Sequence, residues 1–313
     1  MYQGQNLGLT CSFAGMDIQR HALSDELVQL GIIDMAAVTP YYPCVRDRAD
    51  VAVLRCGKSG LIFLSRIDHV AENYYSDQDG LSYWSEEGRE AGLLATREDD
   101  ERRAAMMRPL VKGKVFADVG TGLGGILDLL KADAKELHAV EPQRQAREML
   151  QGLGYSAHAS AAELASSGTK CDVITLFHVF EHLLEPMSEL KDLYEALAPG
   201  GTLIIEVPHA KDALLTTYDL EAFKVFTFWS EHLILHTRES LSRYLSVAGF
   251  TGIEVRGVQR YPLANHLYWL RHGKPGGQSI WPELNAPESA SAYARMLENM
   301  DRTDTLVAVA QKT

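Results

Sequence analysis

Cysteine is scarce in this sequence, and no stretch of it stays apolar for long. The four cysteines, Cys11, Cys44, Cys56 and Cys171, form no CxxC pair and have no close, even spacing. This argues against a disulfide framework or a complete zinc knuckle, so we expect reduced thiols and no metal. The first residues lack a cationic segment followed by an apolar one, and no later apolar run is long enough to span a bilayer. We therefore expect a cytoplasmic protein with no membrane partner.

Positive charge is also in deficit. Lysine and arginine number 30 against 42 aspartates and glutamates, which gives a net charge of −12, and 46% of the residues are hydrophobic. This is the composition of a globular protein, and it excludes collagen, coiled-coil and disordered chains. Because such acidity repels phosphate backbones, we expect a small-molecule substrate and no nucleic acid.

Internal repeats and low-complexity tracts are absent, so hydrophobic periodicity must divide the chain. Residues 1–95 form an irregular N-terminal region. It contains one predicted β-hairpin, in which VAVLRC (51–56) and LIFLS (61–65) flank a Gly-Lys-Ser-Gly turn. A charged helix is expected over 95–107, and residues 96–313 are predicted to form the second domain.

From residue 113 onward, apolar strands alternate with amphipathic helices. The predicted strands are 114–119, 136–141, 156–158, 172–177, 202–207, 252–259 and 305–311, and the predicted helices are 125–132, 143–152, 161–166, 186–197 and 238–248. This alternation predicts an α/β fold with a doubly wound, mostly parallel, seven-stranded Rossmann-like sheet. Residues 260–302 form an insertion before the last strand. They are either a substrate cap or a structural cap that buries Tyr268, Trp269 and Trp281.

A glycine-rich turn follows the first strand of this domain. In VFADVGTGLGG, Asp118 ends the strand, and Gly120, Gly122 and Gly124 lie in the turn into the next helix. Glycines permit positive φ and let a ligand approach the backbone, and the start of the helix offers unpaired N–H donors. We therefore predict that these four residues bind a cofactor. The turn also fits the GxGxxG dinucleotide fingerprint through Gly125, so NAD remains an alternative.

Glu141 ends the next strand, roughly 20 residues beyond this turn, where an acidic residue can bind both hydroxyls of a ribose. A carboxylate at this position favours free hydroxyls over a 2′-phosphate. The cofactor is therefore expected to be S-adenosylmethionine or NAD rather than NADP.

These residues resemble the first motif of the class I S-adenosylmethionine-dependent methyltransferases, acidic-x-Gly-x-Gly-x-Gly. Three further stretches occur in the order of that family: CDVITLFHVFEHL (171–183), LAPGGTLIIEVP (197–208) and SVAGF (246–250). Dehydrogenases lack the Pro-Gly-Gly turn that stands here at residues 199–201, before the fifth strand. The resemblance implies S-adenosylmethionine as the cofactor, and it places Phe177 and His178 in the wall of the adenosine and methyl-transfer pocket.

A second segment, FTFWSEHLILHTRESL, is similar to one in bacterial sugar-nucleotide C-methyltransferases, which carry Tyr-Asp-Glu-His there. Trp229 replaces the tyrosine, and of the zinc-binding cysteines of that family only Cys44 and Cys56 are present here. The resemblance implies a sugar nucleotide or another cell-surface glycan precursor as the acceptor. It also makes His232 the general base, since an imidazole that titrates near neutrality suits proton removal.

Two further residues, Glu206 and His209, end the fifth strand and are expected to face the mouth of the pocket. There either could orient an acceptor, or Glu206 could be a buried, hydrogen-bonded carboxylate. The HVFEH stretch also matches a zinc-peptidase pattern through His178 and His182. We reject that assignment, because no helix is established that would present both histidines, and expect Glu181 and His182 to brace a loop.

An aromatic cluster precedes the domain. Tyr74, Tyr75, Tyr83 and Trp84 could close over the cofactor's sulfonium or pack the N-terminal segment onto the domain.

The sequence thus predicts an S-adenosylmethionine-dependent methyltransferase with His232, His178, Glu206 and His209 as candidate catalytic residues. Two alternatives remain: an NAD-dependent oxidoreductase, and a catalytically silent cofactor-binding partner in a methyltransferase complex.

Overall fold

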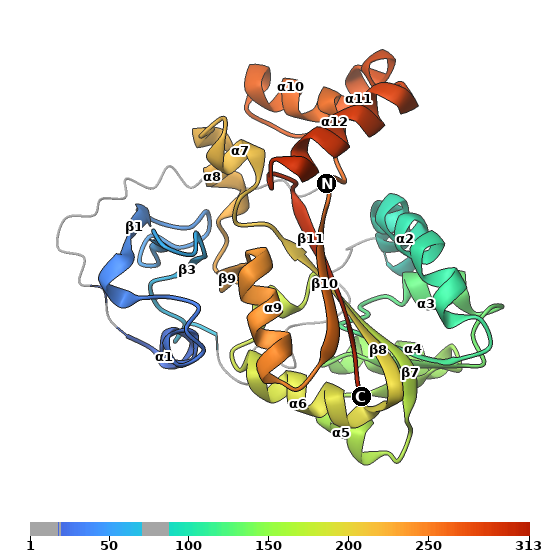
Figure 1. Ribbon diagram of the computed structural model, residues 1–313. Coiled ribbons are helices and arrows are strands. Elements are labelled where there is room, and N and C mark those ends of the chain that lie inside the picture. Colours follow the sequence, from blue (N-terminus) through green and yellow to red (C-terminus); the bar gives the residue numbers. More distant parts are fainter. Residues whose placement is uncertain (1–17, 19, 71–87) are drawn as a thin grey trace.

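The computed structural model describes residues 18, 20–70 and 88–313. Its centre is a seven-stranded sheet with the order β10-β11-β8-β7-β4-β5-β6 (Figure 1). The strands are β4 (Val115–Val119), β5 (Glu136–Val140), β6 (Ser156–His158), β7 (Cys171–Phe177), β8 (Leu197–Pro208), β10 (Thr251–Val258) and β11 (Thr305–Gln311). All neighbours pair in parallel except β11, which is antiparallel to β8 and β10. The predicted α/β sheet is confirmed.

Helices cover both faces of this sheet. One face carries α2 (Arg89–Val111), α3 (Gly125–Leu130) and α4 (Arg144–Gly152), and the other carries α5 (Ala161–Ser166), α6 (Pro186–Ala196) and α9 (Arg238–Val247). Because successive strand residues point to opposite faces, neighbours on one strand serve different cores. On β7, Val173 belongs to the same core as Met107 and Leu127, whereas Ile174 belongs to the core that contains Leu193 and Leu241.

The N-terminal region forms a second, four-stranded antiparallel sheet. It follows α1 (Ala22–Gln29) and η1 (Met35–Ala37), and its order is β1 (Val38–Tyr42), β2 (Val53–Cys56), β3 (Ile62–Leu64) and β9 (Ile234–Leu235). The antiparallel pairing of β2 with β3 confirms the predicted hairpin. Strand β9 comes from the C-terminal half of the chain, so the pairing of Phe63 with Ile234 anchors the segment that carries His232.

The three cysteines among the described residues are in two states. Cys56 and Cys171 are free thiols, as expected, and both are buried. The expectation of reduced thiols is wrong for Cys44, which is disulfide-bonded. Sequence spacing gave no sign of this bond, because pairing depends on the distance between two cysteines in the folded chain.

The insertion is helical. It contains α10 (Leu263–His272), α11 (Gly277–Ile280), η4 (Pro282–Leu284) and α12 (Pro287–Asn299), which lie beyond the adjacent ends of β10 and β11 (Figure 1). Trp269 of α10 is buried, and its ring lies 5.2 Å from that of Phe223 in α8 (Glu221–Thr227). This part of the insertion therefore packs against α8, as expected of a structural cap. Across the ranges described above, no helix combines the length and apolarity needed to cross a membrane.

Candidate functional site

The glycine turn after β4 has the backbone that the motif predicts. Gly120, Gly122 and Gly124 have φ angles of 69°, 54° and 78°, in the left-handed region that side chains disfavour. A Cβ atom on Gly120 would also lie 2.3 Å from Cγ2 of Val179. The turn therefore requires glycine both for its conformation and for its packing.

A cavity of about 410 Å³ opens above this turn, at the carboxyl ends of β4 and β7. Four predicted cofactor residues line it: Asp118, Gly120, Phe177 and His178. Its opposite wall is α2, which contributes Thr96, Asp100 and Arg103 among others. The structure thus joins two separate sequence motifs in one pocket and closes the pocket with a helix.

Asp118 is a buried carboxylate at the edge of this cavity. It accepts a hydrogen bond from the Thr175 hydroxyl at 2.6 Å, and burial raises its pKa to about 6. It lines the cavity, where a carboxylate suits recognition of a cationic group.

Glu141 lies behind the glycine turn and is 3% exposed. It accepts hydrogen bonds from the backbone N–H groups of Gly122, at 2.8 Å, and Gln143, at 2.9 Å, and burial raises its pKa. A carboxylate has about four lone-pair sites. Two hydrogen bonds from a ribose can therefore add to the two hydrogen bonds from backbone amides. The surroundings of Glu141 thus fit a ribose-bearing cofactor.

His178 follows β7 in a conformation that is uncommon outside glycine, with φ of 56°. Its Nδ1 lies 3.1 Å from a carboxylate oxygen of Glu181, and its Nε2 lies 3.5 Å from one of Glu206. Two buried carboxylates thus hold the ring where it lines the cavity. Such backbone strain is most common at functional sites.

Glu206 is fully buried and tied to α2. Arg102 and Arg103 both donate to its carboxylate, at distances of 2.8–3.0 Å. Burial alone would raise the pKa of Glu206, but His178, Arg103 and Arg102 outweigh burial and hold it well below its usual range. The expectation that Glu206 faces the pocket mouth is wrong, because the two arginines cover it.

His209 does not face the mouth either. It is 1% exposed, and its Nδ1 lies 3.0 Å from the carbonyl oxygen of Thr303. Burial lowers its pKa to about 4. The segment before β11 covers this end of β8, which the position of His209 at a strand end could not reveal.

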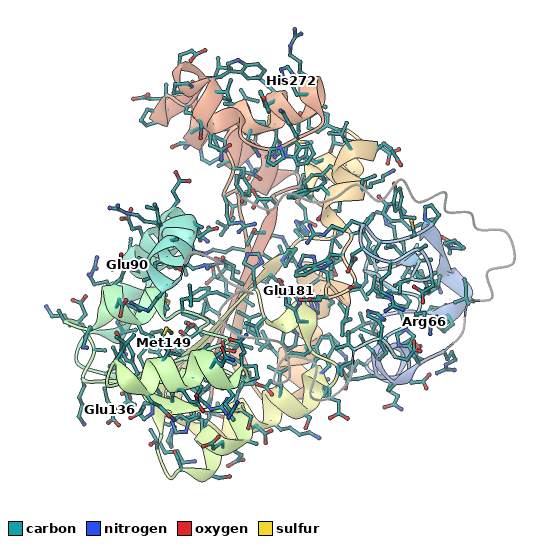
Figure 2. All side chains as sticks on the ribbon, turned by 180° about the vertical axis from the view of Figure 1, so that it is seen from behind. Arg66, Glu90, Glu136, Met149, Glu181 and His272 are labelled. Atoms are coloured by element: carbon teal, nitrogen blue, oxygen red, sulfur yellow. The ribbon has the colours of Figure 1, made fainter. Side chains whose placement is uncertain are left out.

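His232 does not line the cofactor cavity and lies next to Glu181 and His182. Figure 2 shows Glu181 near the middle of the molecule, whereas Arg66 and His272 lie toward its edges. Burial and the neighbouring His182 lower the pKa of His232 to about 3. The expectation that this imidazole titrates near neutrality is therefore wrong.

Sequence reasoning missed the α2 wall of the site. Asp100, Arg102 and Arg103 belong to the acid- and base-rich run REDDERR, which was predicted only as a charged helix. Arg103 is 12% exposed at its side chain and lies 4.9 Å from the centre of the Phe177 ring. The signal was the density of charge on one helix, which a solvent-exposed helix would also show.

The aromatic cluster of Tyr74, Tyr75, Tyr83 and Trp84 lies outside the described residues. Its two interpretations remain predictions.

Comparison with known proteins identifies the family. The model of a methyltransferase domain family matches residues 95–255, and the chain belongs to this family. The cofactor is accordingly S-adenosylmethionine, in agreement with the glycine turn and Glu141.

One curated relative is the ubiquinone biosynthesis O-methyltransferase of Parvibaculum lavamentivorans, which is 38% identical over 100 residues. The match covers 29% of this chain and 38% of that protein. The chain thus matches well under half the length of this relative.

Two solved structures are similar to this chain at 16% sequence identity. The complex between the Haloferax volcanii Trm112 methyltransferase activator and a methyltransferase gives a TM-score of 0.51 at 16% identity, covering 76% of this chain and 99% of the other. The 1,6-didemethyltoxoflavin-N1-methyltransferase of Burkholderia thailandensis gives a TM-score of 0.48 at 16% identity, covering 88% of this chain and 99% of the other.

Proposed function

We propose that the protein is an enzyme that transfers the methyl group of S-adenosylmethionine to a small molecule. The observation that carries this proposal is the single cavity shared by the glycine turn, Asp118 and His178. The turn supplies a close backbone approach, Asp118 supplies negative charge, and His178 supplies an imidazole.

Bound S-adenosylmethionine supplies an already activated methyl group, so the chain must orient the acceptor and accept one proton. Asp118 and the turn hold the amino-acid end of the cofactor, and Glu141 accepts hydrogen bonds from the ribose. We place the proton acceptor at His178 rather than at His232, because His178 lines the cavity. Glu206 and Arg103 act as positioning residues that fix His178 and α2.

The insertion 260–302 contributes to a second cavity, of about 390 Å³, next to the first. Arg260, Tyr261 and Gln278 line it from the insertion, and Arg102 lines it from α2. Both cavities share Ala95 and Thr96 in their linings. We assign this second cavity to the acceptor, and the insertion would act as the cap over the acceptor. Residues 1–95 form the N-terminal region.

Two acceptor classes have support. The resemblance of the segment 229–232 to sugar-nucleotide methyltransferases favours a sugar nucleotide or another glycan precursor. The ubiquinone biosynthesis relative favours an oxygen acceptor on a different kind of molecule.

The test is a screen with S-adenosylmethionine that carries a deuterated methyl group. Nucleotide sugars and phenolic acids are supplied as acceptors, and mass spectrometry follows both the labelled product and S-adenosylhomocysteine. A labelled product that disappears in His178→Asn supports the proposal. Tight binding of S-adenosylhomocysteine without any methylated product would instead favour the catalytically silent partner.

A further inference from the structure

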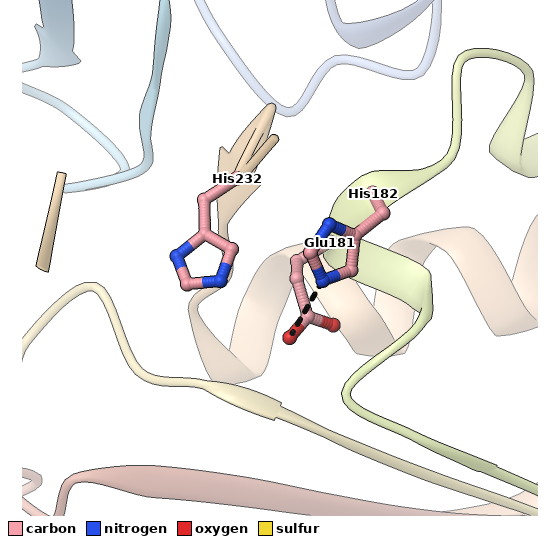
Figure 3. A group of neighbouring side chains, drawn as sticks. All are labelled: Glu181, His182 and His232. Carbon is pink, nitrogen blue, oxygen red and sulfur yellow. Dashed lines mark ion pairs between the residues drawn. The ribbon is translucent and has the colours of Figure 1, made fainter. Parts of the chain in front are cut away.

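Three side chains that do not line the cofactor cavity converge beside it. Glu181 and His182 come from η3 (Phe180–His182), the short turn after β7, and His232 comes from the loop before β9 (Figure 3). One potential ligand atom from each lies within 4.8 Å of the other two. The amide of Leu233 donates to the carbonyl oxygen of Glu181 at 2.9 Å. The backbone therefore holds the two segments together without help from any ligand.

The ring of His182 is oriented as metal-binding histidines are. Its Nδ1 lies 2.8 Å from the carbonyl oxygen of Glu231. A carbonyl oxygen can only accept, so the proton is on Nδ1 and the lone pair is on Nε2. That Nε2 lies 3.9 Å from a carboxylate oxygen of Glu181. A hydrogen bond from one ring nitrogen to a carbonyl is the usual support for a histidine that binds metal through the other.

Two polar atoms of the cluster are buried and have no hydrogen-bond partner among the described residues. They are Oε2 of Glu181 and Nδ1 of His232. Glu181 is 0% exposed, and its other oxygen is 3.1 Å from His178. An unpaired buried oxygen on a carboxylate is costly, and a bound cation would remove that cost.

We propose that Glu181, His182 and His232 form a binding site for one divalent first-row transition-metal ion such as Zn²⁺. Two imidazole nitrogens and one carboxylate oxygen suit these ions better than Mg²⁺ or Ca²⁺, which prefer oxygen ligands. Bonds of about 2.0–2.2 Å in a tetrahedral site hold ligand atoms about 3.4 Å apart. The side chains must therefore close by about 1–1.5 Å, which small side-chain rotations can provide.

The proposed site replaces the expectation of no metal. Three protein ligands leave one coordination position open, as in zinc sites that bind a water or a substrate. The side chain of His182 is 16% exposed, which gives an ion a route to the cluster. The zinc-peptidase pattern remains rejected, because His178 follows a strand and His182 ends a 3-10 turn.

The experiment uses the full chain without an affinity tag, stripped with a chelator and titrated with Co²⁺. Visible absorption reports nitrogen and oxygen ligation, and calorimetry gives stoichiometry and affinity. We expect one Co²⁺ per chain, displaced by Zn²⁺ and not by Mg²⁺. We expect His182→Asn and His232→Asn each to weaken binding by at least about tenfold.

His182→Asn is the decisive variant, because its amide N–H can still donate to the Glu231 carbonyl while the ligand nitrogen is lost. His272→Asn on the surface of α10 and the exposed Glu185→Gln are matched controls that should bind Co²⁺ normally. Absence of Co²⁺ binding by the parent chain, or unchanged binding by His182→Asn and His232→Asn, would overturn the proposal.

A parallel titration with S-adenosylhomocysteine keeps this result separate from the proposed function. Metal binding without cofactor binding would contradict methyl transfer and leave the metal site standing. Cofactor binding without metal binding would overturn the metal site and leave the proposed methyl transfer standing.

Discussion

Arg103 connects the wall of the cofactor cavity to the buried carboxylate of Glu206. Its Nε and Nη2 both donate to Oε1 of that carboxylate, at 3.0 and 2.8 Å. Arg103 lies on α2 and Glu206 near the end of β8. This ion pair therefore holds the helix that closes the cavity against the strand that supports His178.

Replacing Arg103 with methionine should destabilise the protein and weaken cofactor binding together. Hydrogen bonds to a charged group contribute about 1.5–3 kcal/mol each before compensation, and Arg102 still pairs with Glu206 in the variant. We expect the free energy of unfolding in urea to fall by about 1–3 kcal/mol. Arg97→Met, which removes an exposed arginine from the same helix, should change it by no more than about 0.5 kcal/mol. Equal losses in the two variants would show that the Arg103–Glu206 pair has no special role.

Replacing Glu141 with alanine should weaken S-adenosylhomocysteine binding at least about tenfold, which corresponds to roughly 1.4 kcal/mol. The carboxylate supports the glycine turn through Gly122 and accepts the hydrogen bonds of the ribose. Calorimetric titration measures the effect, with the exposed Glu148→Ala as the control. Unchanged affinity in a folded Glu141→Ala variant would remove Glu141 from the cofactor site.

Valine at position 122 should abolish cofactor binding while leaving the fold in place. A β-branched side chain resists the φ of 54° observed at Gly122, and it would occupy space beside the ligand. Circular dichroism tests the fold, and titration with S-adenosylhomocysteine tests the site. The account of the turn fails if Gly122→Val folds and binds normally.

Asp118 should give stability a distinct pH dependence. Its pKa is raised from 3.8 to about 6 by burial. The folded state therefore keeps a proton that the unfolded state releases between these pH values. The contribution of Asp118 to the free energy of unfolding should fall by about 3 kcal/mol as pH rises through this window.

Asp118→Asn cannot ionise at this position, so it should gain stability relative to the parent chain from about pH 4 to pH 6 and keep a constant advantage above that. Urea unfolding at several pH values measures the difference. A difference that does not change with pH would contradict the raised pKa.

The sequence predicted the sheet closely because its central strands, such as β4 and β7, are local apolar runs between turn residues. The predicted bounds of β6 and β11 match the structure, and those of α5 do as well. The start of α2 at Arg89 was missed, since its first two turns carry no clear periodicity. Local sequence patterns thus predict that a helix or strand is present better than they predict its first and last residues.

The site was less accessible to sequence reasoning because its contacts join distant segments. The pair of Arg103 and Glu206 spans 103 positions, and no spacing rule reaches that far. His209 was placed at a strand end correctly, but the segment before β11 buries it. The resemblance of the segment around His232 could not show that this histidine packs with Glu181 and His182.

The most direct test of the central claim is calorimetric titration of the full chain with S-adenosylhomocysteine and, separately, with NADH. We predict saturable binding of S-adenosylhomocysteine at one site per chain, lost in Gly122→Val, and no binding of NADH. Binding of NADH at the Gly122 turn without binding of S-adenosylhomocysteine would contradict the account.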